Sequence, residues 1–176
     1  MAEWNAALDG YQKPTNAPVP TYAQVVGVVN AKAAPRDYMI TAAGDLPGET
    51  MKNWRCKTTN SYDLEFGFSC MGYEIAGGWG AKMADPTRDV IVMVGDGSYM
   101  LMNSDIYSTV LTGHKLIIIV CDNGGYAVIS RLQNFKGTPG FNNLLKDCKT
   151  AIPAFSVDFV KHAESMGARA KKVESL

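Results

Sequence analysis

Two uninterrupted apolar runs constrain the fold of this chain more than any other feature. DVIVMV (residues 89–94) leads directly into Gly95-Asp96-Gly97, and KLIIIV (115–120) leads into CDNGG. A continuous apolar run predicts a strand that is covered on both faces, which is typical of parallel sheets. The 20 residues between the two runs leave room for the helix that a parallel crossover requires. The sequence therefore predicts an α/β fold.

The remaining segments extend the alternation of strands and helices. Buried strands that alternate with helices predict a doubly wound parallel sheet with helices on both faces, in three layers. Ligands of such sheets bind at the carboxyl ends of the strands. The expected elements are helices over 21–33, 70–85 and 98–113, a last helix capped by Ser156, strands over 37–43 and 168–173, and an irregular stretch over 126–155.

The segment before Pro86 carries two stripes at helical spacing. A helix with one large stripe and one small stripe can pack closely against a sheet or a second helix, and proline ends it. The large stripe is Met71, Ile75, Trp79 and Met83, and the small stripe is Gly72, Ala76 and Gly80.

Composition limits the partners of the chain. Its 176 residues suit one domain, and 17 basic residues balance 17 acidic ones, so no charge excess points to nucleic acid or to an anionic membrane. The apolar runs are too short to span a bilayer, and four scattered cysteines suggest reduced thiols in a cytoplasmic protein. Residues 1–20 are interpreted as a lead-in or linker segment, and 21–176 as the domain.

Several common nucleotide and hydrolase motifs are absent from the sequence. GDGSYM does not fit the dinucleotide fingerprint, because Met100 occupies the position of its third glycine. The chain also contains no phosphate-loop lysine motif, no G-x-S-x-G elbow and no H-E-x-x-H. These absences disfavour a nicotinamide enzyme or a simple nucleotide enzyme.

The residues at the two strand ends favour a cation with an anion beside it. Asp96 offers a carboxylate, Ser98 stands at the start of a helix where backbone amides attract anions, and Asn123 offers an amide oxygen. Mg²⁺ takes oxygen ligands and usually completes its shell with substrate phosphates and water. The alternative is structural: Asp96 caps a helix and Asn123 forms a turn.

The spacing of these residues resembles the thiamine diphosphate (ThDP) enzymes. Their motif is GDG followed some 24 to 27 residues later by two asparagines, and here 24 residues separate Gly97 from Asp122-Asn123. Asp122 departs from the family at the first asparagine, whereas the metal ligand of the family is the second. Trp79 departs at a position that is usually aliphatic.

One branch of that family is resembled more closely. AAGDLPGE, YDLEFGFSCMGYEIAGGWGAKMA and VMVGDGSYMLMNS are similar to the hydrolases that open trihydroxycyclohexane-1,2-dione in bacterial inositol breakdown. The resemblance implies C–C bond hydrolysis that yields 5-deoxy-glucuronate. A ThDP-dependent decarboxylase, an acetolactate synthase-type carboligase, and a non-catalytic or split-enzyme cofactor module remain alternatives.

The resemblance also implies a metal site. The side chains of Asp96 and Asn123 and the carbonyl of Gly125 would bind Mg²⁺. Asn123 and Gly125 would thereby also border the diphosphate.

The same resemblance implies a cofactor site around the metal. Gly97, Ser98 and the turn that begins at Gly44-Asp45 would line the diphosphate. Met71 would prop the cofactor into its bent shape, and the alternative for Met71 is a plain core residue on the stripe with Ile75.

The family implies partners as well. Its members have a second domain that binds the aminopyrimidine and supplies an activating glutamate. This chain matches only the diphosphate domain, which we expect to be truncated. Glu65 and Glu74 do not match the activating position, so no catalytic residue is assigned. A pyrimidine-binding domain on the same or a second chain and a homo-oligomer are expected.

Overall fold

A computed structural model gives the fold of residues 1–15, 17–148 and 156–176; the end of the irregular stretch predicted over 126–155 lies outside them. Its centre is a parallel sheet with the strand order β2-β1-β3-β4. The sheet confirms the predicted α/β class. The strands are β1 Tyr38–Thr41, β2 Tyr62–Leu64, β3 Val90–Gly95 and β4 Ile117–Cys121.

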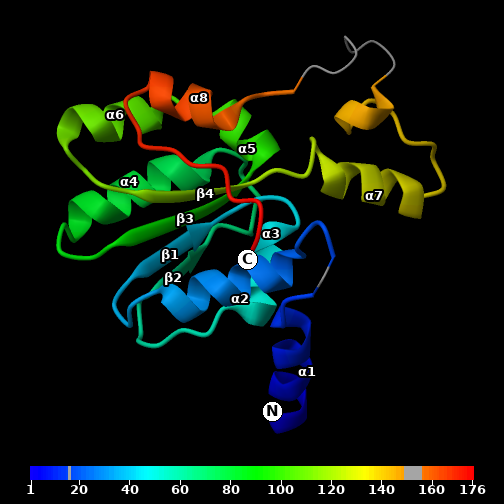
Figure 1. Cartoon of the computed structure of the whole chain (residues 1–176), viewed down its shortest axis with the longest axis horizontal. Coiled ribbons are helices and arrows are strands. Elements are labelled where there is room, and N and C mark those ends of the chain that lie inside the picture. The colour runs from blue at the N-terminus through cyan, green and yellow to red at the C-terminus, as the bar shows by residue number, and fades with distance from the viewer. Residues whose placement is uncertain (16, 149–155) are drawn as a thin grey trace.

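Helices lie on both faces of this sheet (Figure 1). One layer contains α2 and α3, and the other contains α4, α6 and α8. The helices are α1 Ala2–Gln12, α2 Tyr22–Lys32, α3 Leu46–Asn53, α4 Tyr73–Ala84, α5 Asp96–Leu101, α6 Asp105–Thr112, α7 Ala127–Phe135 and α8 Phe159–Ser165, with a short 3-10 turn at Leu145–Asp147.

Strand β3 divides the core into two halves, because successive side chains of a strand point to opposite faces. Val92 and Val94 pack with Ile75 of α4 and Ile106 of α6. On the other face, Met93 packs with residues of α2 and α3. Covering on both faces explains why the whole run from Val90 is apolar.

Helix α4 lies against the sheet through Ile75 and a face that otherwise differs from the predicted stripes. A Cβ on Gly78 would lie 2.6 Å from Val92 Cγ2, so the absence of a side chain there lets the helix approach β3. Gly80, predicted on the packing stripe, faces open space. Met83 is exposed and Met71 precedes the helix. Ile75 of the large stripe is buried as predicted, but the rest of the buried face follows Glu74, Gly78 and Lys82, so the predicted stripes are rotated from it.

The single helix predicted over 98–113 is wrong, because the chain forms two short helices there. Helix α5 begins at Asp96 and ends at Leu101, and α6 begins at Asp105. Met102 leaves the helical conformation, and the Asn103 side chain donates to the carbonyl of Met100 at 3.3 Å. Asparagine competes for backbone groups in this way and interrupts helices.

Other expected elements also differ. The strand predicted over 168–173 is absent: its residues from 171 onward are exposed and too polar to add to a sheet edge. Asp158, not Ser156, caps the last helix. Strand β2, helix α3 and helix α7 lie where turns and irregular chain were predicted.

The segment 1–20, interpreted as a lead-in, contains helix α1. Leu8 of α1 is buried, and Gln12 donates to the backbone carbonyl of Asn53 in α3 at 3.1 Å. Arg55 pairs with Asp9 at 2.8 Å. Helix α1 therefore packs on α2 and α3 while its first turns extend away from the sheet (Figure 1).

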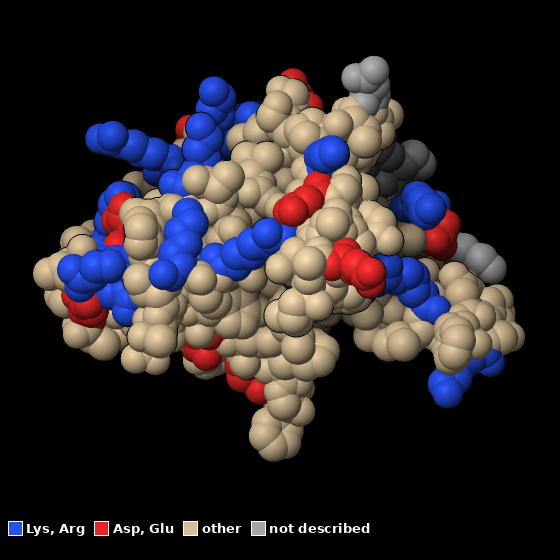
Figure 2. All heavy atoms as spheres, turned by 90° about the horizontal axis from the view of Figure 1, so that it is seen from below, with Lys and Arg blue, Asp and Glu red and all other residues tan. Residues whose placement is uncertain are grey.

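Basic and acidic side chains are interspersed on the face shown in Figure 2, in keeping with a net charge of zero. Within the described ranges, every helix is too short or too polar to cross a bilayer.

Candidate functional site

The predicted site residues come together at the carboxyl edge of the sheet. Gly95, the last residue of β3, lies in register with Cys121, the last residue of β4. The GDG segment and the loop after β4 therefore leave the sheet side by side. The loop after β1 begins at the same edge because β1 pairs in parallel with β3.

Asp96 is the central residue of this edge. Its side chain lies in the first turn of α5, and the residue is only 6% exposed. Its Oδ2 accepts a hydrogen bond from the backbone N–H of Gly125 at 2.7 Å. Its Oδ1 is buried without a hydrogen-bond partner among the described residues. A buried oxygen that lacks a partner is costly, so this atom is suited to accept a cation as its partner.

The electrostatics agree with that reading. Burial, reinforced by the nearby charge of Asp122, raises the pKa of Asp96 above its ordinary value. Hydrogen bonds from the backbone oppose this shift in pKa. A bound divalent cation would favour the charged carboxylate and reverse the effect of burial.

The loop after β4 is shaped by two glycines. Gly124 and Gly125 have φ values of +79° and +135°, which side-chain-bearing residues rarely adopt. The N–H of Gly124 donates to Oδ1 of Asp122 at 3.0 Å. A Cβ on Gly125 would lie 2.4 Å from the backbone oxygen of Asn143. Only glycine therefore fits at position 125, where the resemblance placed a carbonyl ligand.

Asn123 lies between these glycines and Asp122, and its side chain is exposed. Its Nδ2 donates to the phenol oxygen of Tyr22 at 2.6 Å. The amide is thus held from the side of α2, and its Oδ1 stays available.

Gly97 lies close to two large side chains. A Cβ at this position would be 2.8 Å from the Tyr126 ring and 3.5 Å from Cε of Met71. The structure therefore brings Met71 to the GDG segment, although Met71 is distant in sequence. Ser98 follows in the same turn and is buried.

The turn after β1 meets helix α7. Gly44 has a φ of +86°, and Asp45 is the N-cap residue that precedes α3. The carboxylate of Asp45 forms an ion pair with Arg131 of α7. Because that carboxylate is negative, a diphosphate at this turn would be bound by backbone N–H groups or by Arg131, and not by the Asp45 side chain.

A buried carboxylate joins two of these segments. Glu74 of α4 is 0% exposed. Its Oε1 accepts from the N–H of Ala43 at 3.2 Å and its Oε2 from the N–H of Gly72 at 2.9 Å. Glu74 therefore fixes the start of the Gly44 turn relative to Met71.

The donor set fits a hard cation. One carboxylate oxygen without a partner, one free amide oxygen and a glycine loop supply oxygen atoms only, which is what Mg²⁺ prefers. Among the residues that the structure describes, no cluster of three His, Cys, Asp or Glu side chains could hold a metal alone. Non-protein oxygens, such as those of a diphosphate, would therefore have to complete the shell.

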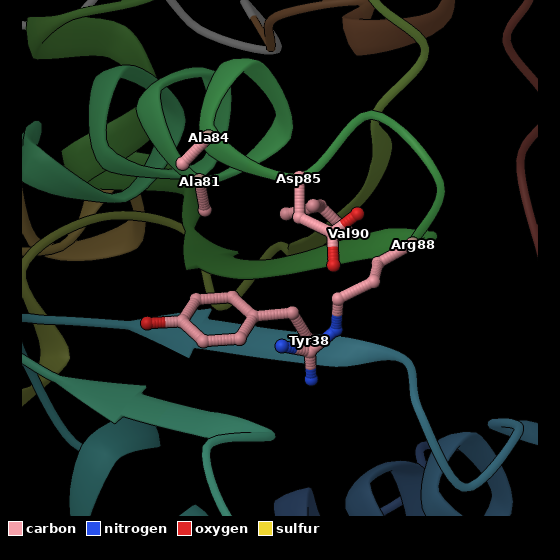
Figure 3. Close-up of a pocket in the computed structure, with 6 residues that line it drawn as sticks. All are labelled: Tyr38, Ala81, Ala84, Asp85, Arg88 and Val90. Carbon is pink, nitrogen blue, oxygen red and sulfur yellow. The ribbon is translucent and has the colours of Figure 1, made fainter.

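A cavity lies elsewhere, away from these residues. It has a volume of about 180 Å³ and is lined by side chains at the starts of β1 and β3, including Tyr38 and Val90 (Figure 3). Arg88 lies over the Tyr38 ring at 5.2 Å and donates to two backbone carbonyls. This cavity is at the opposite end of the strands from Asp96.

Comparison with known families identifies the chain. Residues 42–176 match the model of the C-terminal TPP-binding domain of thiamine pyrophosphate enzymes. The chain belongs to the thiamine pyrophosphate enzyme family.

Two curated relatives of this thiamine pyrophosphate enzyme chain carry the same name, 3D-(3,5/4)-trihydroxycyclohexane-1,2-dione hydrolase. The protein from Geobacillus thermodenitrificans is 36% identical over 161 residues, and that from Bacillus cereus strain AH820 is 34% identical over 163. Each alignment covers 89% of this chain and 25% of the relative. The chain thus spans about a quarter of the length of these relatives.

A solved structure confirms the fold. The ThDP-dependent 4-hydroxybenzoylformate decarboxylase of Rhodococcus jostii RHA1 aligns with a TM-score of 0.75, over 92% of this chain and 29% of the decarboxylase. Its sequence identity is 20%, so the likeness concerns the fold alone.

Three residues near the site at the carboxyl edge of the sheet were not predicted from the sequence: Tyr22, Tyr126 and Arg131. Tyr22 and Arg131 reach the site from segments without a motif, and the Tyr22 contact spans 101 residues; Tyr126 directly follows the Gly124-Gly125 loop. No periodic signal distinguishes them from surface residues of the helices that carry or follow them.

Proposed function

We propose that this chain is the ThDP- and Mg²⁺-binding domain of an enzyme that hydrolyses a C–C bond in trihydroxycyclohexane-1,2-dione and forms 5-deoxy-glucuronate. The observation that carries the cofactor assignment is the unpartnered Oδ1 of Asp96 beside Asn123 and the Gly125 loop. The names of the two curated relatives support the choice of substrate.

In this proposal, each segment of the site has one task. Asp96, Asn123 and the Gly125 carbonyl hold Mg²⁺, and the cation holds the diphosphate. Backbone groups at Gly97 and Ser98 contact the phosphate oxygens. When bound, ThDP supplies the carbon nucleophile and electron sink for the cleavage. Met71, whose Cε lies close to Gly97, supports the cofactor.

The activating glutamate is proposed to lie on a pyrimidine-binding domain outside this chain or elsewhere in a longer chain. We further propose a homo-oligomer, in which the pyrimidine-binding domain of one subunit completes the site on another. Within residues 1–176, no side chain is therefore assigned as a general acid or base.

The test begins with cofactor binding by the full-length protein. Titration with ThDP at saturating Mg²⁺ should give saturable heat that chelator abolishes. Asp96→Ala should abolish the Mg²⁺-dependent heat. Asp89→Ala is the matched control, because Asp89 lies just before the other end of β3 and pairs with Lys115 at the surface. Mg²⁺-independent binding, or binding that survives Asp96→Ala, would overturn the metal assignment.

The reaction is tested separately. The same protein should consume the cyclic dione and release 5-deoxy-glucuronate, and should leave 2-oxo acids unchanged. Release of carbon dioxide from a 2-oxo acid without dione hydrolysis would replace the proposal with a decarboxylase.

A further inference from the structure

We propose that Tyr22 is a positioning residue for the divalent cation, which holds the amide of Asn123 so that its oxygen faces the metal. The inference rests on the metal site proposed above. Tyr22 lies outside the range 42–176 that the family model matches, and it belongs to a helix from the opposite part of the chain.

In the structure, the contact with Tyr22 occupies one end of the Asn123 amide and leaves the other end available. Nδ2 of Asn123 donates to the phenol oxygen of Tyr22 at 2.6 Å. An amide has one donor group and one acceptor oxygen. Since the phenol engages the donor group, Oδ1 is the atom left for a cation. An amide turned the other way would present N–H groups to the metal and repel it.

Tyr22 is itself held in place. Thr21 and Gln24 form a capping box at the start of α2, which fixes the backbone around Tyr22. Gln24 also donates to the carbonyl of Lys13 at 2.7 Å. The Tyr22 ring packs against the buried cluster that includes Val26 and Met93. Its phenol is therefore a rigid point on the molecule.

Asn123, in contrast, depends on this contact. It is exposed and is followed by two glycines in positive-φ conformations. Among the described residues, Tyr22 is the hydrogen-bond partner of the Asn123 side chain. Without the phenol, the amide would sample several rotamers, and binding a cation would require the protein to order it first. Loss of such an outer contact typically weakens metal binding by about 10–100-fold.

The experiment measures the Mg²⁺ concentration that half-saturates ThDP binding in the full-length protein. Tyr22→Phe removes the phenol oxygen and keeps the ring. We expect the half-saturating Mg²⁺ concentration to rise by about tenfold or more, while the ThDP affinity at saturating Mg²⁺ and the thermal midpoint of the apoprotein change little.

Tyr62→Phe is the matched control. Tyr62 packs against the same cluster, and its phenol lies 3.1 Å from Thr50 Oγ1, remote from the site. This variant loses an equivalent hydrogen bond and should keep the wild-type Mg²⁺ requirement. A Tyr22→Phe protein with the wild-type Mg²⁺ requirement would overturn the inference. An equal change in Tyr62→Phe would also overturn it, because general loosening of the cluster would then explain the effect.

The two proposals fail in different ways. If Asp96→Ala keeps Mg²⁺-dependent binding, the metal site itself is wrong. If Asp96→Ala loses it and Tyr22→Phe does not weaken it, the metal site stands and the role of Tyr22 falls.

Discussion

The N–H of Gly125 donates to Oδ2 of Asp96 at 2.7 Å, across 29 residues of sequence. This contact joins the ends of β3 and β4 through a main-chain donor. The other carboxylate oxygen of Asp96 is buried and has no hydrogen-bond partner within the described part of the chain. The site is thus built by the loop geometry at Gly125 as much as by the side chain of Asp96.

Gly125→Ala should damage both the loop and the proposed metal site. The new Cβ would lie 2.4 Å from the backbone oxygen of Asn143, so the chain must shift. Gly124→Ala is the control: Gly124 also has a positive φ but has open space around it. Both variants lose roughly 1–2 kcal/mol to the left-handed backbone, and Gly125→Ala should lose about 1–3 kcal/mol more from the clash. Urea unfolding measures the difference, and equal losses would contradict it.

Gly97→Ala should separate stability from cofactor binding. Gly97 lies in α5, where alanine is the better helix former by about 1 kcal/mol. Its Cβ would, however, push the Tyr126 ring, which is 2.8 Å away and exposed enough to move. We expect little loss in the free energy of unfolding, and ThDP binding that is weaker by at least about tenfold, or ~1.4 kcal/mol.

The control for this variant is Gly95→Ala. Gly95 ends β3 two residues earlier, and a Cβ there meets nothing within 4 Å. Weakened ThDP binding in Gly95→Ala as well would show that any added methyl in this segment disturbs the site.

The sequence could predict the edge of the sheet at which the site lies. The apolar runs before Gly95 and Asp122 predict strands, and parallel neighbours end at one edge. The adjacency of Asp96 and the Gly125 loop follows from these two facts. The expected burial on both faces holds for β3 but not for β4, an edge strand whose Ile117 is exposed. The roles of the site residues remain predictions, and the experiments above test them.

The sequence could not predict what depends on tertiary contacts. Strand β2 has three residues and exists through pairing with β1. The break at Met102 depends on how α6 packs on the sheet, since Ile106 is buried and Met102 is not. The Tyr22–Asn123 contact joins two segments without a shared pattern. Helix α4 shows that the face buried in the structure can be rotated from a stripe that residue spacing predicts.

Cys121 should be a poorly reactive thiol. Burial, followed by the charge of Asp96, raises the pKa of Cys121 from 9.0 to about 11. At pH 8 its thiolate fraction is therefore very small, and alkylation by iodoacetamide should be slower than at the exposed Cys56. Because the folded protein holds this proton more tightly than the unfolded chain, the contribution of Cys121 to stability is complete below pH 9 and is lost as the pH rises through about 11.

Mass spectrometry after brief alkylation measures both thiols in one sample. The unfolded protein, in which the two cysteines should react alike, is the reference. Equal labelling of Cys121 and Cys56 in the folded protein at pH 8 would contradict the assigned environment.

Glu74→Gln should destabilise the protein although it keeps the shape of the side chain. Both carboxylate oxygens of Glu74 accept backbone hydrogen bonds in the fully buried interior. A glutamine has one acceptor oxygen, and its amide N–H groups would face the N–H of Ala43 or of Gly72. One buried donor then loses its partner, at a cost of about 1–3 kcal/mol. Denaturant unfolding of the apoprotein measures this loss.

The matched control is Glu65→Gln. The carboxylate of Glu65 also accepts from two backbone N–H groups, those of Phe68 and Cys70, but it lies at the surface. Water can replace the lost acceptor there, so Glu65→Gln should lose much less stability than Glu74→Gln. Because Glu74 sets the Gly44 turn against Met71, its variant should also bind ThDP more weakly at saturating Mg²⁺. Equal stability losses in the two variants would show that burial of Glu74 contributes nothing beyond its hydrogen bonds.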